Sequence, residues 1–134
     1  MSSTSLWQSE IKEHNLQLVT SPLQGETNTQ VAIIGAGITG TAAALWLSRA
    51  GMQVQVLEAR NIAAGASGRN GGFISAGTTA SYAHIIQRYG HGLARRLWTF
   101  TVCNQEMLKG FIDELEQSGW SCSYRCNGSL KLAL

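Results

Sequence analysis

Two short apolar runs, joined by a glycine turn and a helical segment, are the clearest pattern along the chain. Val31–Ile34 is continuously apolar and stops at a glycine, as expected of a parallel strand buried on both faces. From Ile38 the apolar positions follow helical spacing, and Gly51 suits the left-handed position that ends a helix. Val54–Leu57 is rich in β-branched residues and ends at Glu58. The pattern predicts a βαβ unit with parallel strands and a right-handed crossover.

The rest of the chain is less regular. Met1–Gln30 is mostly polar, and Pro22 and Gly25 break any regular element there. Gly92–Ser118 is the longest periodic segment, with apolar residues every three or four positions, and predicts one amphipathic helix. Residues 121–134 predict extended chain, in which the final leucines alternate as in a strand.

Composition narrows the class of protein without identifying it. The 134 residues carry a net charge of +2 with scattered basic residues, so nothing indicates a nucleic-acid partner. The three cysteines are an odd number, which favours reduced thiols over disulfides or a metal site. The polar N-terminus lacks the apolar core of a secretory signal, and Val31–Leu47 is too short and too interrupted by glycine to span a membrane. We therefore expect a soluble cytoplasmic domain without a metal site.

The turn after the first strand has the spacing of a phosphate-binding loop. In a loop of this kind the first glycine permits a tight turn, the second lets the backbone approach a pyrophosphate, and the third lets the helix pack closely on the strand. The free N–H groups of the first helical turn then favour the negative charge of a diphosphate. The loop residues are Gly35, Ala36, Gly37, Ile38, Thr39 and Gly40.

An acidic residue follows the loop at the expected distance. Glu58 lies at the end of the second predicted strand, 18 residues after Gly40. A carboxylate there can accept hydrogen bonds from both ribose hydroxyls of an adenosine and would repel a 2′-phosphate, which disfavours NADP. The alternative is a glycine-rich turn of another α/β protein, with Glu58 as a solvated strand end. NAD and FAD share these features, so the loop and the acid leave both cofactors open.

Other polar and aromatic residues show no functional pattern. His84 and His91 lack a nearby carboxylate or cysteine and are interpreted as surface residues, with Gly90 breaking the helix between them. Trp46 and Trp98 fall on predicted helices and are interpreted as packing residues. No Ser-His-Asp, Cys-His or paired-carboxylate arrangement is visible, so the catalytic residues stay unknown.

The segment after Glu58 carries a family resemblance. Arg60–Ile74, with the sequence RNIAAGASGRNGGFI, resembles the segment after the second strand in the FAD-dependent D-amino-acid-oxidase (DAO) superfamily, most closely in the branch that includes gamma-glutamylputrescine oxidoreductases. Pro22–Gly25 partly matches a stretch that precedes the first strand in that branch. The match is best over Val31–Ile74 and looser beyond it. The alternative for this segment is a flexible glycine-rich linker that binds no cofactor.

The resemblance implies contacts along the cofactor. Glu58 would hold the adenosine ribose, with Ala59 and Arg60 lining the adenine end. Ala66 and Ser67 would meet the diphosphate, Ser67 through its hydroxyl and its backbone N–H. Successive amides in a glycine-rich segment do form an anion-binding concavity, which agrees with this expectation.

The same resemblance implies a flavin end. Asn70, Gly71 and Gly72 would pass close to the isoalloxazine ring, where small residues leave room for its flat face. Arg69 would either stabilise negative charge on the reduced flavin or hold the loop through carbonyl groups, and we favour the second role. No histidine or cysteine lies in this segment, so covalent attachment of the flavin there is not expected.

The expected fold is α/β, a Rossmann-like FAD/NAD(P)-binding βαβ unit with a parallel sheet, truncated before the substrate domain. Residues 1–30 would form an N-terminal extension. Residues 31–134 would form an incomplete FAD-binding domain. FAD is the cofactor that the resemblance implies.

The implied activity belongs to a parent protein. It would oxidise the C–N bond of a small amine or amino acid, with a hydride passing from carbon to flavin N5 and the resulting imine hydrolysing. The chain alone is expected to be inactive. One alternative is a non-catalytic FAD- or ADP-binding fragment or subunit that needs another polypeptide. A further one is the NAD-binding domain of a dehydrogenase.

Overall fold

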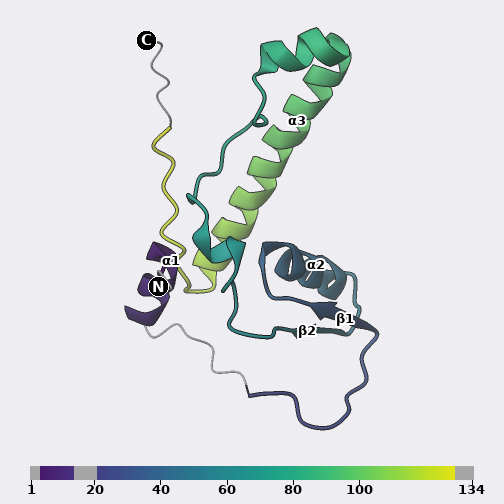
Figure 1. Cartoon of the computed structure of the whole chain (residues 1–134), viewed down its shortest axis with the longest axis vertical. Coiled ribbons are helices and arrows are strands. Elements are labelled where there is room, and N and C mark those ends of the chain that lie inside the picture. Colours follow the sequence, from purple (N-terminus) through teal and green to yellow (C-terminus); the bar gives the residue numbers. More distant parts are fainter. Residues whose placement is uncertain (1–3, 14–20, 129–134) are drawn as a thin grey trace. The chain divides into compact units, whose positions relative to one another are not determined.

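A βαβ unit lies at the centre of the first half of the chain (Figure 1). In this computed structural model, which describes residues 4–13 and 21–128, strand β1 spans Val31–Ile34, helix α2 spans Ile38–Arg49 and strand β2 spans Val54–Leu57. The strands are parallel, with Val31 opposite Val54 and Ile34 opposite Leu57. The predicted strands and helix are confirmed. Gly51 has a φ of +82°, which is the left-handed conformation expected just after the helix.

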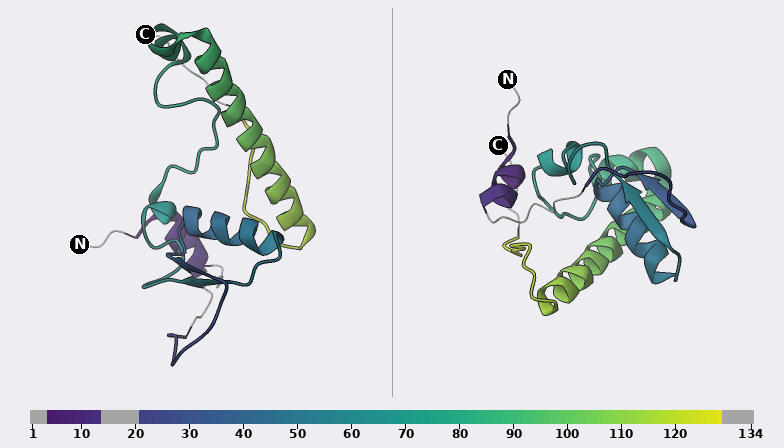
Figure 2. Two further views of the ribbon diagram at one scale, coloured as in Figure 1. Left: turned by 90° about the vertical axis from the view of Figure 1, so that its right-hand side faces the viewer. Right: turned by 90° about the horizontal axis from the view of Figure 1, so that it is seen from below.

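Helix α2 packs on one face of the two strands (Figure 2). Burial alternates along β1, where Val31 and Ile33 are half-buried while Ala32 and Ile34 are exposed. The apolar run has the composition of a strand that is buried on both faces, but in the described residues one face is exposed. One helix can cover only one face of a sheet, so the other face stays open.

A short helix precedes the βαβ unit. Helix α1 spans Leu6–Glu13, within a stretch whose composition predicted no regular element, so that prediction is wrong here. Ser5 and Gln8 explain its start, because the backbone N–H of Gln8 donates to Ser5 Oγ and that of Ser5 donates to Gln8 Oε1, each at 3.2 Å. This reciprocal pair is a capping box. Pro22 and Gly25 lie well after the helix and do not disturb it.

The chain divides into two compact units, Met1–Gly72 and Phe73–Leu134. Helix α3, Tyr82–Gln117, is the main element of the second unit. It begins before the predicted Gly92, because Ser81 caps an additional segment by accepting a hydrogen bond from the N–H of His84 at 3.2 Å. Gly90 interrupts the helix with a φ of +82° and a ψ of 163°.

The remaining predictions for the second unit have mixed outcomes. His84 and His91 are exposed on either side of Gly90, as expected. Trp98 packs edge-on against Tyr82, with ring centroids 5.8 Å apart. Residues 121–128 form no strand, and the predicted strand at the end of the chain lies outside the described residues. Across the described segments, no helix combines the length and apolarity that a membrane crossing requires.

Candidate functional site

The glycine loop makes a tight turn between β1 and α2. Gly35 has a φ of +101°, and its N–H donates to the carbonyl of Leu57 at 2.7 Å. A Cβ on Gly40 would lie 2.0 Å from the carbonyl oxygen of Gly35 and 3.3 Å from Ile33 Cγ2. Both glycines are therefore required by the backbone itself, the first for its conformation and the second for the close packing of α2 on β1.

The first turn of α2 is open to an anion. Its N-cap residue is Gly37, which offers no capping side chain, and the turn contains no acidic residue. The N–H of Ile38 donates to Ser67 Oγ at 2.8 Å, and a Cβ on Gly37 would lie 3.0 Å from the same oxygen. The positive end of the helix therefore faces a hydroxyl that can exchange partners, and the turn itself carries no acidic side chain.

Glu58 is held beside the loop by two backbone N–H groups. Its Oε2 accepts from Ala36 at 2.8 Å, and its Oε1 accepts from Arg60 at 3.0 Å. These hydrogen bonds, led by that from Ala36, lower the pKa of the Glu58 carboxyl below its ordinary value. The group is thus ionised at neutral pH. Its two oxygens have about four lone-pair sites, so acceptor capacity is left for hydroxyl donors.

The segment after Glu58 folds back on the loop. The N–H of Ala63 donates to the carbonyl of Ala36 at 3.0 Å, and the short helix η1, Ala66–Arg69, follows. Asn70 ties the next turn together, because its Nδ2 donates to the carbonyl of Ser67 at 2.5 Å and its Oδ1 accepts from the N–H of Gly72 at 2.7 Å. These bonds argue against the flexible linker. We call residues 64–72 the strip.

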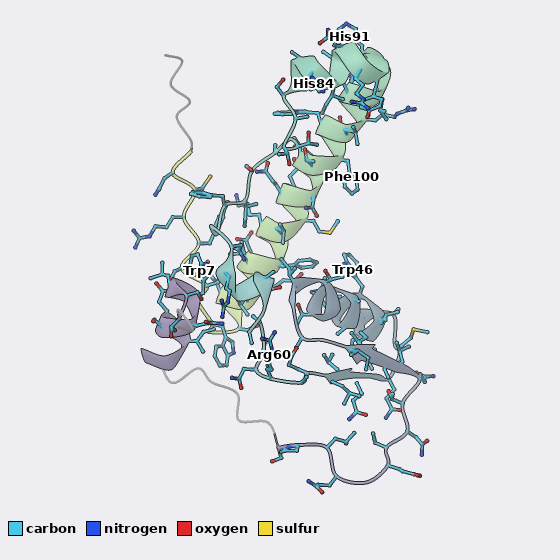
Figure 3. The ribbon with its side chains drawn as sticks, viewed as in Figure 1. Trp7, Trp46, Arg60, His84, His91 and Phe100 are labelled. Atoms are coloured by element: carbon cyan, nitrogen blue, oxygen red, sulfur yellow. The ribbon has the colours of Figure 1, made fainter. Side chains whose placement is uncertain are left out.

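The predicted contact residues gather around two elements. Those of the glycine loop surround the start of α2, and those of the strip follow η1. Most of their side chains are at least partly exposed and so accessible to a ligand. The exposed members are Ile38, Thr39, Ala59, Arg60, Ala66, Arg69, Asn70, Gly71 and Gly72. Arg60, labelled in Figure 3, lies on the segment that leaves β2.

Sequence reasoning missed one group of residues near the strip. Ser5, Trp7 and Gln8, at the start of α1, each donate a side-chain hydrogen bond to a carbonyl of residues 64–72. The Ser-x-x-Gln spacing of a capping box could have indicated the helix. No local pattern could have indicated its contacts.

These features fit FAD. The start of α2 offers N–H groups to a diphosphate, with that of Ile38 already on the Ser67 hydroxyl, and Gly37 leaves no Cβ in the way. The ionised Glu58 stands at the neighbouring strand end, where an adenosine ribose binds in such folds. The strip adds a second stretch of accessible backbone, as a long cofactor requires.

Comparison with known proteins agrees with this geometry. The sequence model of the family described as FAD dependent oxidoreductase (DAO) matches residues 30–134. Gamma-glutamylputrescine oxidoreductase of Escherichia coli (strain K12) is 36% identical over 98 residues, which cover 73% of this chain and 22% of that protein. The "Probable oxidoreductase OrdL" of Haemophilus influenzae is 33% identical over 104 residues, which cover 77% of this chain and 24% of that protein.

The chain thus spans roughly a quarter of the length of these relatives. No solved structure shows a significant match. The family match covers most of the chain, including the glycine loop, Glu58 and the strip. The chain therefore belongs to the family of FAD-dependent oxidoreductases, and its cofactor is FAD.

Proposed function

We propose that this chain is the N-terminal FAD-binding portion of an oxidoreductase that oxidises the C–N bond of an amine or amino acid. The observation that carries the proposal is the glycine loop beside Glu58, both at the carboxyl ends of parallel strands. Ligands of such sheets bind at this edge. The name of the Escherichia coli relative, a gamma-glutamylputrescine oxidoreductase, supports an amine as the substrate class.

In this proposal the chain binds the adenosine and diphosphate through fixed groups. Glu58 accepts from the ribose hydroxyls, with Ala59 and Arg60 beside the adenine. The N–H groups at the start of α2 face the diphosphate. The Ser67 hydroxyl, which accepts from Ile38, still has its own proton to donate to a phosphate oxygen.

The strip orients the rest of the cofactor. Asn70, Gly71 and Gly72 lie next to the flavin ring in this proposal, and Arg69 holds the turn. When bound, FAD supplies the two-electron oxidation of the carbon that bears the nitrogen. The chain contributes binding and orientation, and the groups that choose the substrate are not identified among its residues.

The Glu58→Ala variant tests the cofactor site. Loss of a charged acceptor should weaken FAD binding about ten- to a hundredfold. The measurement is a titration of the 134-residue chain with FAD, followed by flavin fluorescence. The matched control is Glu106→Ala, an exposed glutamate on α3, which should bind like wild type. Equal FAD affinities of the Glu58 and Glu106 variants would show that Glu58 does not contribute to FAD binding.

A second experiment tests the reaction. Flavin absorbance is followed without oxygen while a panel of amines, amino acids and 2-hydroxy acids is added. The gene product that carries this chain should lose flavin absorbance with one class of amine or amino acid, and the 134-residue chain alone should lose none. A positioned substrate carbon is needed for the step, and positioning contributes several kcal/mol to such barriers. Bleaching only by hydroxy acids would contradict the C–N assignment.

The short span of the match favours one other candidate, a non-catalytic FAD-binding subunit that needs another polypeptide. It predicts the same titration result but no bleaching by any substrate unless a second chain is supplied. Bleaching that appears only when a second polypeptide is added would therefore select this candidate.

A further inference from the structure

The strip that the proposed function places along FAD is attached to helix α1. Ser5 Oγ donates to the carbonyl of Gly68, Trp7 Nε1 donates to that of Asn70 at 2.9 Å, and Gln8 Nε2 reaches that of Ala64 at 3.4 Å. The donors all belong to the cap and first turn of one helix. The partners of Ser5 and Trp7 are each 63 positions away along the chain.

Trp7 also packs on the strip with its ring, which lies against Gly72. A Cβ on Gly72 would lie 2.4 Å from Trp7 Cζ2 and 2.8 Å from Cη2, so only a glycine lets the indole approach this closely. Gly72 has a φ of +70°, a conformation that other residues rarely adopt. The indole therefore fixes both the carbonyl of Asn70 and the backbone of Gly72.

These contacts change what the strip presents to an anion. Backbone carbonyl oxygens carry partial negative charge, and a strip with free carbonyls would repel a diphosphate. Helix α1 covers the carbonyls of Ala64, Gly68 and Asn70 with donors. A strip whose carbonyls are already engaged is also more rigid, which lowers the entropy lost when a cofactor binds.

We propose that Trp7 is a positioning residue for FAD, which acts through Asn70 and Gly72 by holding the strip in its binding shape. This inference rests on the proposed function for the strip and adds α1 to the cofactor site. Trp7 itself needs no contact with the cofactor. Its effect is transmitted by the hydrogen bond to Asn70 and by the ring on Gly72.

The first arm of the test uses the 134-residue chain without FAD. Amide hydrogen exchange is measured for peptides covering residues 64–72 and, as an internal reference, for peptides covering β1 and β2. Trp7→Ala should raise exchange in the strip and leave both strands as in wild type. Trp46→Ala, a change of a half-exposed tryptophan on α2, is the matched control and should leave the strip unchanged. Equal strip exchange in wild type and Trp7→Ala would overturn the inference.

The second arm adds FAD. Trp7→Ala should weaken binding about tenfold, and Trp7→Phe, which keeps a ring but loses the N–H, should fall in between. At saturating FAD, where the bound fraction is the same for each variant, the absorbance band of the flavin should lose fine structure in the same order. Trp46→Ala should bind like wild type. FAD affinities of the Trp7 variants within twofold of wild type would contradict the positioning role of Trp7.

The two arms separate the possible failures. If wild type binds FAD and the Trp7 variants bind equally well, the inference fails and the proposed function stands. If wild type and every variant fail to bind FAD, the proposed function fails and the role of Trp7 falls with it. If Trp7→Ala also raises exchange in β1 and β2, the variant is globally unfolded, and Trp7→Phe then decides by the same criteria.

Discussion

At the scale of single residues, Glu58 shows how a carboxylate is fixed in place at the edge of the sheet where the cofactor is proposed to bind. Two backbone donors, Ala36 and Arg60, fix its two oxygens and lower its pKa. The donor from Ala36 belongs to the glycine loop, so the acid and the loop are held in one arrangement before any ligand arrives. A preorganised acceptor loses less freedom when a ribose binds.

The lowered pKa gives a pH dependence with a definite sign. The folded state favours the ionised form of Glu58, so its contribution to the free energy of unfolding is complete above the ordinary pKa of a glutamate. The contribution declines as the pH falls through that range and disappears below the lowered pKa. The stability advantage of wild type over Glu58→Gln should therefore be constant near neutral pH and shrink in acid. Denaturant titrations across pH measure it, and an advantage that grows in acid would contradict this account.

At the scale of elements, α2 packs on β1 at a glycine whose place no larger residue could take. The closest approach is at Gly40, where an added Cβ would meet the backbone of Gly35. Backbone atoms cannot rotate away as a flexible side chain can. The close approach of this helix to β1 therefore requires a glycine at position 40.

Alanine substitutions of two helical glycines test this dependence. Gly40→Ala should destabilise the chain by about 1–3 kcal/mol, because overpacking forces the helix off the strand. Gly110→Ala, in α3, is the matched control, since nothing lies within 4 Å of its added Cβ. It should stabilise the chain by up to about 1 kcal/mol, since alanine favours helix. Thermal or denaturant unfolding measures both, and similar effects of the two changes would refute the packing argument.

At the scale of the whole molecule, much apolar surface stays open. Among the described residues the buried apolar side chains are only Ala36, Ile85 and Ala94. Ile34 on β1 is 81% exposed and Phe73 is 90% exposed. Exposed apolar area of this kind marks surface that associates with other groups. Each unit therefore buries little core.

The chain without FAD should be marginally stable, should bind a hydrophobic dye and should self-associate as its concentration rises. A ligand that binds only the folded state stabilises it by mass action, by about 2.7 kcal/mol at a hundredfold excess over Kd. FAD should therefore raise the melting temperature. Glu58→Ala at the same FAD concentration should respond less. Dye fluorescence, light scattering and thermal melts check this. Absence of dye binding would contradict the expected exposure of apolar surface. A melting temperature that FAD does not change would contradict the expected stabilisation by the cofactor.

The βαβ unit and its loop could be predicted from local sequence patterns alone. Three patterns carry that prediction: the apolar runs of β1 and β2, the helical spacing of α2 and the glycine spacing between them. Each pattern spans only a few neighbouring residues, because it reflects short-range sterics and the burial of one face. The family resemblance rested on the segment after Glu58, and the family match confirmed it. Helix α3 was predicted only in part, because the cap at Ser81 lies before its strong periodicity.

How distant segments meet could not be predicted in this way and is seen in the folded chain. Three contacts join residues that are far apart in sequence. They are the hydrogen bonds from Ile38 to Ser67 and from Ala36 to Glu58, and the packing of the Trp7 ring on Gly72. Such contacts leave no periodicity, since a hydroxyl or an indole ring looks the same in the sequence whether or not a partner faces it. Chain folding brings the partners together, so the arrangement of the site follows from packing and not from any one motif.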